Sequence, residues 1–440
     1  MKRHRWHLLA LMLALVLAAV AAGCGGDDDE EGEGAATTAE TEEAVSGSVS
    51  IMAVWTGPEQ EGFQAVLDGF TEANPDVDVN YTSAGDQLPT QLSTAVEGGN
   101  PPDVAVLPQP GLMRDFAGQD ALQPLDFARE DIETNLGESA IELGSVDDTL
   151  YGFLFKAANK STVWYNVAAF EDAGVEPPES WDDMIAAAET INASGVPAWS
   201  IGGADGWTLT DLFENIYLRT AGPEMYDQLS NHEIPWTDQS VKDALTEMAK
   251  IVGDTENIAG GTAGALQTDF PTSVSNVFSE NPKAAIVIEG DFVPGVVESP
   301  LEPETGFNVF DFPAIGDSPP SVVGGGDTVV MFTDSPAAQA LIRYLTTAEA
   351  AEAWASRGGF ASLNKDLDTS VYPDAITQAT AGPLAEAEVF RFDLSDLQPA
   401  AFGGTVGQGL FKLFQDFLQN PQNVDGITQQ METAAAAAFG

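Results

Sequence analysis

The sequence is poor in cysteine, histidine and basic residues. Cys24 is the one cysteine among 440 residues, so an internal disulfide or a cysteine-based zinc site is impossible. Three histidines leave little for a histidine-rich metal centre, and we expect no metal ion. The chain has 16 Lys+Arg against 69 Asp+Glu, a formal net charge of −53. Because such an excess repels phosphate backbones, we also expect no nucleic-acid partner.

Catalytic and nucleotide-binding signatures are missing as well. The chain has no GxSxG, HExxH or GxxxxGK motif, and its glycine clusters at 324–326 and 403–409 do not follow the GxGxxG spacing behind a strand. We therefore predict a protein that is not an enzyme and needs no cofactor. A secreted carbohydrate-active enzyme stays open as an alternative, because 69 acids inevitably include carboxylate pairs.

Residues 1–23 have the pattern of an export signal. Three basic residues precede an unbroken apolar run of 15 residues at 8–22, which is short for a stable membrane span. The sequence Ala-Ala-Gly-Cys that follows resembles the bacterial lipobox, in which the cysteine is lipidated and becomes the first residue of the mature protein. The resemblance implies export, cleavage before Cys24, lipidation of Cys24 and anchoring to the outer face of the cell membrane.

The segment behind the cysteine cannot fold by itself. Residues 24–46 hold nine acids, no cation and no aromatic residue. A segment of this composition buries too little apolar surface to offset the entropy of ordering. We predict a disordered acidic tether over residues 24–46 and a folded body that begins near Gly47.

The first part of the body alternates short strands and helices. Strands are predicted over 47–55, 77–81 and 103–107, with amphipathic helices at 63–70 and 87–97 between them. This order predicts an α/β fold with a parallel sheet and helices on both faces. In such sheets ligands lie outside the carboxyl ends of the strands, so the loops after Val54, Tyr81 and Leu107 are the places for a site.

A second block of α/β pattern starts near Tyr151. It contains predicted helices at 181–192, 208–219 and 238–252 and a buried strand at 284–289. Hydrophobic residues make up 44% of the chain, and at this length one core normally divides into two or more. We therefore expect two lobes.

Seven segments, taken in order, resemble the extracellular solute-binding proteins of ABC importers, in the large sugar-binding group that includes maltose- and α-glucoside-binding proteins. The segments are VWTGPEQEGFQAVLDGFTEANPDVDVNY (54–81), GGNPPDVAVLPQPG (98–111), YGFLFKAANKSTVWYN (151–166), AGVEPPESWDDM (173–184), AAIVIEGDF (284–292), YLTTAEAAEAWASRGGFASLNKDL (344–367) and FRFDLSDLQPAAFGG (390–404). The resemblance covers essentially all of residues 47–440.

The resemblance implies a two-lobed clamp, each lobe a mostly parallel sheet with helices on both faces, joined by three hinge crossovers. The crossovers would fall near residues 155–159, 322–326 and 358–363. Lobe one would hold residues 47–155 and 326–358, and lobe two residues 156–325 and 359–440. The implied function is a monomeric receptor that captures a neutral sugar, an α-linked di- or oligosaccharide, and delivers it to ABC permease subunits. A receptor of the same fold for a polyol or a polyamine is the alternative.

The resemblance and the strand-end loops together give a set of predicted ligand contacts. They are Trp55, Glu59, Asp86, Gln109, Lys156, Asn159, Asp205, Trp207, Asp291, Phe292 and Asp327. A sugar presents apolar C–H faces and a rim of hydroxyls, so aromatic planes and a few carboxylates or amides suit it. Most of these residues also have a structural interpretation: Glu59 can stabilise a helix N-terminus, and the glycine-flanked Asp205 can form a turn.

Overall fold

The computed structural model describes residues 45–381, 384 and 389–440. The predicted export signal, Cys24 and the tether up to residue 44 lie outside the described residues. The described residues form one compact unit. Within the part of the chain that the structure describes, no helix is both long and apolar enough to cross a membrane.

The larger sheet contains the three predicted N-terminal strands. Its strands are β1 (Gly47–Ala53), β2 (Val77–Ser83), β3 (Val104–Leu107), β6 (Gly152–Asn159), β10 (Ser321–Met331) and β11 (Val389–Phe392). Their order is β11-β10-β3-β1-β2, with β6 also paired to β10. The β1–β2, β1–β3 and β10–β11 pairs are parallel, while β10 runs antiparallel to β3 and to β6. We call β1, β2, β3 and the parts of β6 and β10 beside them, together with the helices packed on these strands, the first lobe.

Helices cover both faces of the first-lobe sheet, as its strand pattern predicts. They are α1 (Gly57–Ala73), α2 (Leu88–Glu97), α3 (Pro110–Gly118), α4 (Arg129–Leu136), α5 (Glu138–Gly144), α13 (Pro336–Leu345) and α14 (Ala348–Ala355). Val49 and Ile51 of β1 pack into the core beneath α1, α13 and α14, whereas Met52 packs into the core beneath α2 and α3. Alternate side chains of one strand therefore supply two cores.

The smaller sheet differs from the prediction. It has the order β8-β7-β9, where β7 is Thr162–Asn166, β8 is Ile286–Ile288 and β9 is Phe307–Asp311. Both of its strand pairs are antiparallel. The expectation of a mostly parallel sheet in each lobe is therefore wrong for this sheet. The reason is that a short apolar run such as 284–289 identifies a buried strand but carries no information on its direction.

The smaller sheet and its helices form the second lobe. The remaining helices of the chain are α6 (Val167–Ala173), α7 (Trp181–Ser194), α8 (Trp207–Ala221), α9 (Pro223–Ser230), α10 (Gln239–Val252), α11 (Gly261–Ala265), α12 (Phe270–Val277), α15 (Ala375–Ala381), α17 (Ala400–Gly403), α18 (Gly409–Gln419) and α19 (Val424–Phe439). Val163 and Tyr165 of β7 pack against the core of α7, α8, α10 and α18, while Trp164 between them enters a separate core with Phe278 and Phe307.

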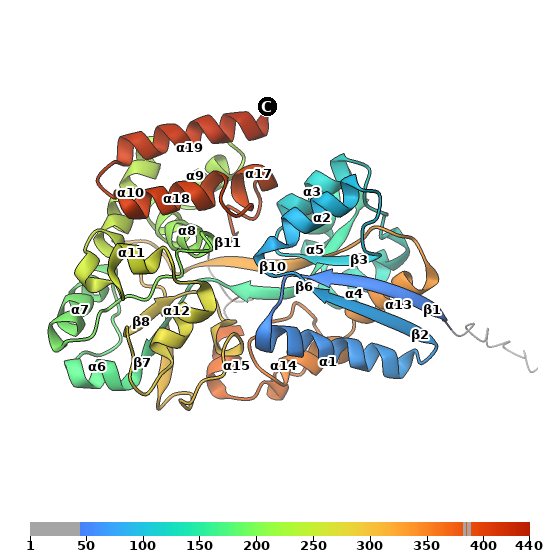
Figure 1. Cartoon of the computed structure of the whole chain (residues 1–440), viewed down its shortest axis with the longest axis horizontal. Coiled ribbons are helices and arrows are strands. Elements are labelled where there is room, and N and C mark those ends of the chain that lie inside the picture. The colour runs from blue at the N-terminus through green and yellow to red at the C-terminus, as the bar shows by residue number, and fades with distance from the viewer. Residues whose placement is uncertain (1–44, 382–383, 385–388) are drawn as a thin grey trace, which may run out of the picture. The chain divides into compact units, whose positions relative to one another are not determined.

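Strands β6 and β10 run between the lobes (Figure 1). Val323 near the start of β10 belongs to the second-lobe core, and Val329 belongs to the first-lobe core. Ala157 of β6 pairs with Gly326 of β10 on one side, and its N–H donates to the carbonyl of Ala361 at 2.9 Å on the other. The three predicted crossover segments thus lie side by side, although the lobe boundaries at single residues remain a prediction.

A close backbone contact joins α3 of the first lobe to the segment before α17. The N–H of Gly111 donates to the carbonyl of Asp396 at 2.8 Å, and a Cβ added at Gly111 would lie 2.0 Å from the carbonyl oxygen of Gln398. Position 111 therefore has no room for a side chain.

Replacing Gly111 by alanine is expected to lower the free energy of unfolding by about 1–3 kcal/mol, because the backbone around Gln398 must move. Gly118→Ala in the same helix is the matched control, since nothing lies within 4 Å of a Cβ there. Denaturant unfolding of both variants measures the difference. Equal stability of the two would contradict the close-contact argument.

Candidate functional site

A cavity of about 540 Å³ lies between residues of both lobes. The first lobe lines it with the loops that follow β1, β2 and β3, as expected for the carboxyl ends of parallel strands. The second lobe lines it with the first turns of α8 and α12 and with residues just before and after α17. The hinge strands β6 and β10 also contribute side chains. A cavity of this volume is in the usual range for small-molecule sites.

Nine of the eleven predicted contact residues line this cavity. They are Trp55, Glu59, Asp86, Gln109, Lys156, Asp205, Trp207, Phe292 and Asp327. Asn159 and Asp291 do not line it. The Asn159 side chain is 1% exposed and serves the β6–β7 turn, where its Oδ1 accepts from the N–H of Ser161 at 3.0 Å. The N–H of Asp291 donates to the carbonyl of Asn159 at 2.9 Å, which joins the backbones of these two residues.

The first-lobe wall is built around Lys156. Its Nζ forms an ion pair with Glu59 in the first turn of α1, and it lies 5.2 Å from the centroid of the Phe292 ring. Burial lowers the pKa of Lys156, but Glu59 and Asp327 outweigh burial and leave that pKa above its usual value. Burial raises the pKa of Asp327 to about 6, against the opposing effect of Lys156. The lysine therefore stays charged and holds two carboxylates in place.

Trp55 is more a core residue than an exposed aromatic face. It is 3% exposed, and its ring packs on Phe63 and Trp354 with centroids 4.7 Å away in each case. Its Nε1 donates to Oδ2 of Asp327 at 2.8 Å. Of the two predicted tryptophan contacts, Trp55 thus mainly positions Asp327.

The second-lobe wall presents Asp205 and Trp207 at the start of α8. Gly206 between them has a φ of +92°, a conformation that a residue with a side chain rarely adopts. Asp205 Oδ2 accepts from the N–H of Phe270 at 2.6 Å. The half-buried Trp207 ring packs edge-on against Phe270, 4.8 Å between centroids, and also near Phe292. This turn brings a carboxylate and an aromatic plane to one place in the cavity.

Carboxylates dominate the polar lining. Seven Asp and Glu side chains line the cavity against two lysines. Burial raises the pKa of Asp205 to about 6, and Asp86 on the opposite wall adds to the rise. Burial likewise raises the pKa of Asp86, with contributions from Asp269 and Glu59. A site with this lining accepts hydrogen bonds and disfavours anions.

A further polar group in the cavity was missed by sequence reasoning. Lys160 in the turn after β6 bonds to Asp393 at 2.5 Å and to Asp211 of α8 at 3.2 Å, and lies 3.5 Å from Asp396. Lys160, Asp211 and Asp396 line the cavity. These acids are 51 to 236 positions from Lys160 along the chain, so no local pattern brings them together. The available signal was a lysine between the apolar residues of two strands, β6 and β7.

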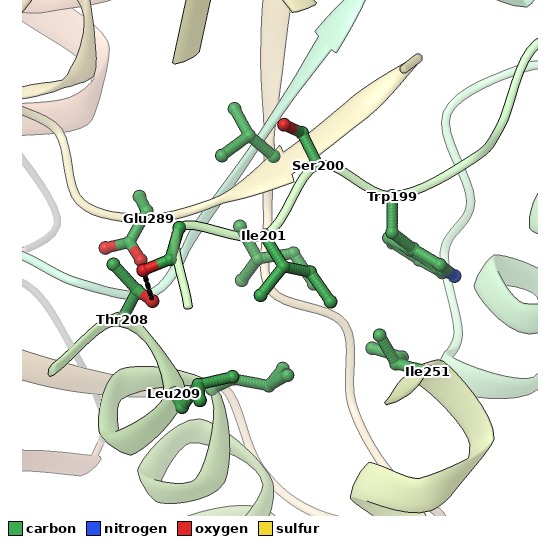
Figure 2. Close-up of a pocket in the computed structure, with 11 residues that line it drawn as sticks. Trp199, Ser200, Ile201, Thr208, Leu209, Ile251 and Glu289 are labelled. Carbon is green, nitrogen blue, oxygen red and sulfur yellow. Dashed lines mark hydrogen bonds between the residues drawn. The ribbon is translucent and has the colours of Figure 1, made fainter. Parts of the chain in front are cut away.

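A second, much smaller cavity lies inside the second lobe. Figure 2 shows Glu289 and Thr208 at one end of it and Trp199 and Ile251 at the other. Its volume is about 20 Å³, which suits one water molecule and excludes a sugar. Thr208 Oγ1 donates to the carbonyl of Gly202 at 2.9 Å. The larger cavity is therefore the candidate ligand site.

Metal binding has no support in the geometry of the described residues. Over residues 45–381 and 389–440, no group of three or more His, Cys, Asp and Glu side chains is arranged to hold a metal ion. The cavity carboxylates face lysines, backbone N–H groups or one another instead.

Comparison with known proteins agrees with this geometry. Residues 56–352 match the model of the family described as bacterial extracellular solute-binding protein. The chain belongs to this family. It is 35% identical over 370 residues to the osmoprotective compounds-binding protein GgtB of Synechocystis sp., which covers 82% of this chain and 87% of that protein. It is 33% identical over 379 residues to the α-glucosides-binding periplasmic protein AglE of Rhizobium meliloti, covering 83% and 81%.

Solved structures of solute-binding proteins have the same fold. The bacterial solute receptor AcbH, described as exclusive for β-D-galactopyranose, superposes with a TM-score of 0.78 at 20% identity, over 89% of this chain and 99% of that one. The predicted two-lobed α/β fold is thereby confirmed. The chain is therefore an extracellular solute-binding protein with this two-lobed fold.

Proposed function

We propose that this solute-binding protein captures a neutral, α-linked di- or oligosaccharide in the 540 Å³ cavity and releases it to ABC permease subunits. The observation that carries the proposal is the pairing of the half-buried Trp207 ring with Asp205 on the wall opposite Glu59 and Asp86. An aromatic plane binds the C–H face of a pyranose, and carboxylates accept from its hydroxyls. The similarity to AglE, an α-glucosides-binding protein, supports the same ligand class.

The second candidate ligand is a polyol-like osmoprotective compound. The similarity to GgtB, named for osmoprotective compounds, favours it. The excess of carboxylates over lysines in the lining also leaves a polyamine as a ligand to be tested. A carbohydrate-active enzyme is the least favoured function, since the matched family consists of binding proteins.

The proposal extends to the location and state of the receptor. Cleavage before Cys24 and lipidation of its thiol would anchor the body to the outer face of the cell membrane through the acidic segment 24–46. The receptor would act as a monomer. Metabolic labelling with a palmitate analogue, with Cys24→Ser as the negative control, tests the anchor directly.

Thermal unfolding of the purified chain with a ligand panel tests the ligand class. The panel holds maltose, trehalose, sucrose, maltotriose, glucose, glycerol and spermidine. A ligand present at 100 times its dissociation constant should add about 2.7 kcal/mol of stability, which raises the melting temperature by about 2–4 °C for a body of this size. We expect the rise with one of the α-linked sugars.

The other outcomes of the panel would indicate a different ligand class or a different function. A rise with glycerol alone or spermidine alone would replace the sugar by a polyol or a polyamine. Release of glucose from an oligosaccharide would establish an enzyme instead of a receptor.

A further inference from the structure

We propose that Asp211 and Asp396, held in place by Lys160, form a hydroxyl-binding subsite in the second-lobe part of the cavity, separate from the Asp205–Trp207 turn. The inference rests on the proposed function and names a part of the same site that the predicted contact set does not include. Lys160, Asp211 and Asp396 all line the cavity, whereas Asp393, which also binds Lys160, does not.

The hydrogen-bonding capacity of Lys160 is fully used. A lysine ammonium has three N–H donors, and three carboxylates lie around Nζ: Asp211 at 3.2 Å, Asp393 at 2.5 Å and Asp396 at 3.5 Å. The lysine is 9% exposed and the three acids are at most 7% exposed. No donor of Lys160 is therefore left for a further acceptor at this place.

Two buried acceptors in the cavity wall nevertheless lack an N–H or hydroxyl donor from the described residues. They are Oε1 of Gln109 and Oδ2 of Asp211, whose neighbour is the buried carboxyl of Glu289. Asp211 is 1% exposed and Gln109 5% exposed, and both line the cavity. A buried acceptor left without a donor is costly, so a molecule that brings donors is favoured here.

The charges around Lys160 favour a ligand hydroxyl over an anion or an ammonium group. A bound anion would meet Asp211 and Asp396 and is repelled. A bound ammonium would lie beside the Lys160 ammonium and is disfavoured by like charge. Lys160 Nζ is also 5.8 Å from the centroid of the Trp207 ring, so the same corner borders an aromatic plane. A ligand hydroxyl can donate to the carboxylates, and an apolar C–H face beside that hydroxyl can pack on the Trp207 ring.

The charged groups around Asp211 make binding proton-linked. Asp211 faces Lys160 from the β6–β7 turn, Asp393 and Asp396 from the segment after β11, Glu289 from the segment after β8, and Glu214 from its own helix. Burial raises the pKa of Asp211 to about 8, with Lys160 opposing. A hydroxyl that donates to this group favours its ionised form. Binding should therefore release protons near neutral pH and tighten as pH rises toward 8.

Titration calorimetry with maltose, trehalose and sucrose tests the subsite on the purified wild-type chain, Asp211→Asn and Asp396→Asn. We expect each variant to weaken the sugar that binds wild type by about tenfold, because an acceptor of a charged hydrogen bond is replaced by an amide. Wild type should release protons on binding, as seen in two buffers of different ionisation enthalpy, and Asp211→Asn should lose most of this release. A merely structural role of Asp211 would not change proton release.

Asp103→Asn is the matched control. Asp103 is a half-buried carboxyl that accepts from the N–H of Ser50 at 2.8 Å, and it does not line the large cavity. Its sugar affinity should stay within about twofold of wild type. If the Asp211→Asn variant does not fold, the affinity of Asp396→Asn tests the subsite. Asp396 is less buried than Asp211, so its substitution perturbs folding less.

The outcomes separate the subsite from the proposed function. Wild type that binds a sugar, with both asparagine variants equally tight, overturns the subsite and leaves the sugar receptor intact. Wild type that binds none of the sugars overturns both. Binding of spermidine that depends on Asp211 overturns the hydroxyl ligand in favour of an amine.

Discussion

Lys160→Met is expected to lower the free energy of unfolding at pH 8 by about 3–5 kcal/mol, because the substitution removes one partner of a buried ionic cluster. Methionine keeps the apolar stem, so the loss reports the charge. Asp211, Asp393 and Asp396 would then be buried without the cation that compensates them. Denaturant unfolding at constant salt measures the loss.

The loss should shrink when the pH falls to 5. Without Lys160 the pKa values of Asp211 and Asp396, which burial already raises, rise further, and the pKa of Asp393 loses the main effect that lowers it. The folded form therefore binds more protons than the unfolded chain between about pH 4 and pH 8. Stability then falls as pH rises through that window and is regained on acidification. A deficit that is the same at pH 5 and pH 8 would indicate lost packing rather than uncompensated charge.

Lys412→Met is the control for the lysine substitution. Lys412 pairs with Asp416 on the surface, with side chains 48% and 35% exposed. An exposed pair of this kind contributes less than about 1 kcal/mol. A comparable effect of both substitutions would remove the argument for the buried cluster.

Trp207→Ala is expected to weaken sugar binding by about 10- to 100-fold, since central aromatic anchors carry much of the affinity of a binding site. The ring lines the cavity next to Asp205 and is held by Phe270 and Phe292. Trp207→Phe keeps an aromatic plane and should recover part of the affinity. Calorimetry with the panel sugar that binds wild type gives the comparison.

Phe310→Ala separates binding from folding. Phe310 of β9 is also half-buried and packs on Tyr165, 5.8 Å between centroids, but it does not line the cavity. The Phe310→Ala variant should lose about as much stability as the Trp207→Ala variant and should keep wild-type sugar affinity. Unchanged affinity in Trp207→Ala would mean that the ring has a packing role alone.

Local sequence signals predicted most of the elements correctly. Ser180 caps α7 by accepting from the N–H of Asp183, and Ser335 caps α13 by accepting from that of Ala338, as the spacing indicates. Thr347 caps α14 in the same way, by accepting from the N–H of Ala350. Capping is a short-range interaction, which is why the sequence alone reveals it.

Long-range arrangements could not be predicted in this way. The strand direction in the smaller sheet depends on how the chain returns β8 and β9 to β7. An apolar run in the sequence does not reveal this direction. The Lys160 cluster joins acids from α8 and from the segment after β11. Asn159 and Asp291 were predicted as contacts from neighbouring motifs, and neither lines the cavity. Pairings over such separations follow from the tertiary fold.

The half-buried position of Trp207 gives the receptor a built-in optical reporter. Among the described residues, the other tryptophans, Trp55, Trp164, Trp181, Trp199, Trp236 and Trp354, are at most 3% exposed. Solvent exclusion around the cavity therefore alters the emission of Trp207 far more than that of the buried rings. Intrinsic fluorescence can follow the occupancy of this cavity on the millisecond scale, without a label and without a chemical change to the chain.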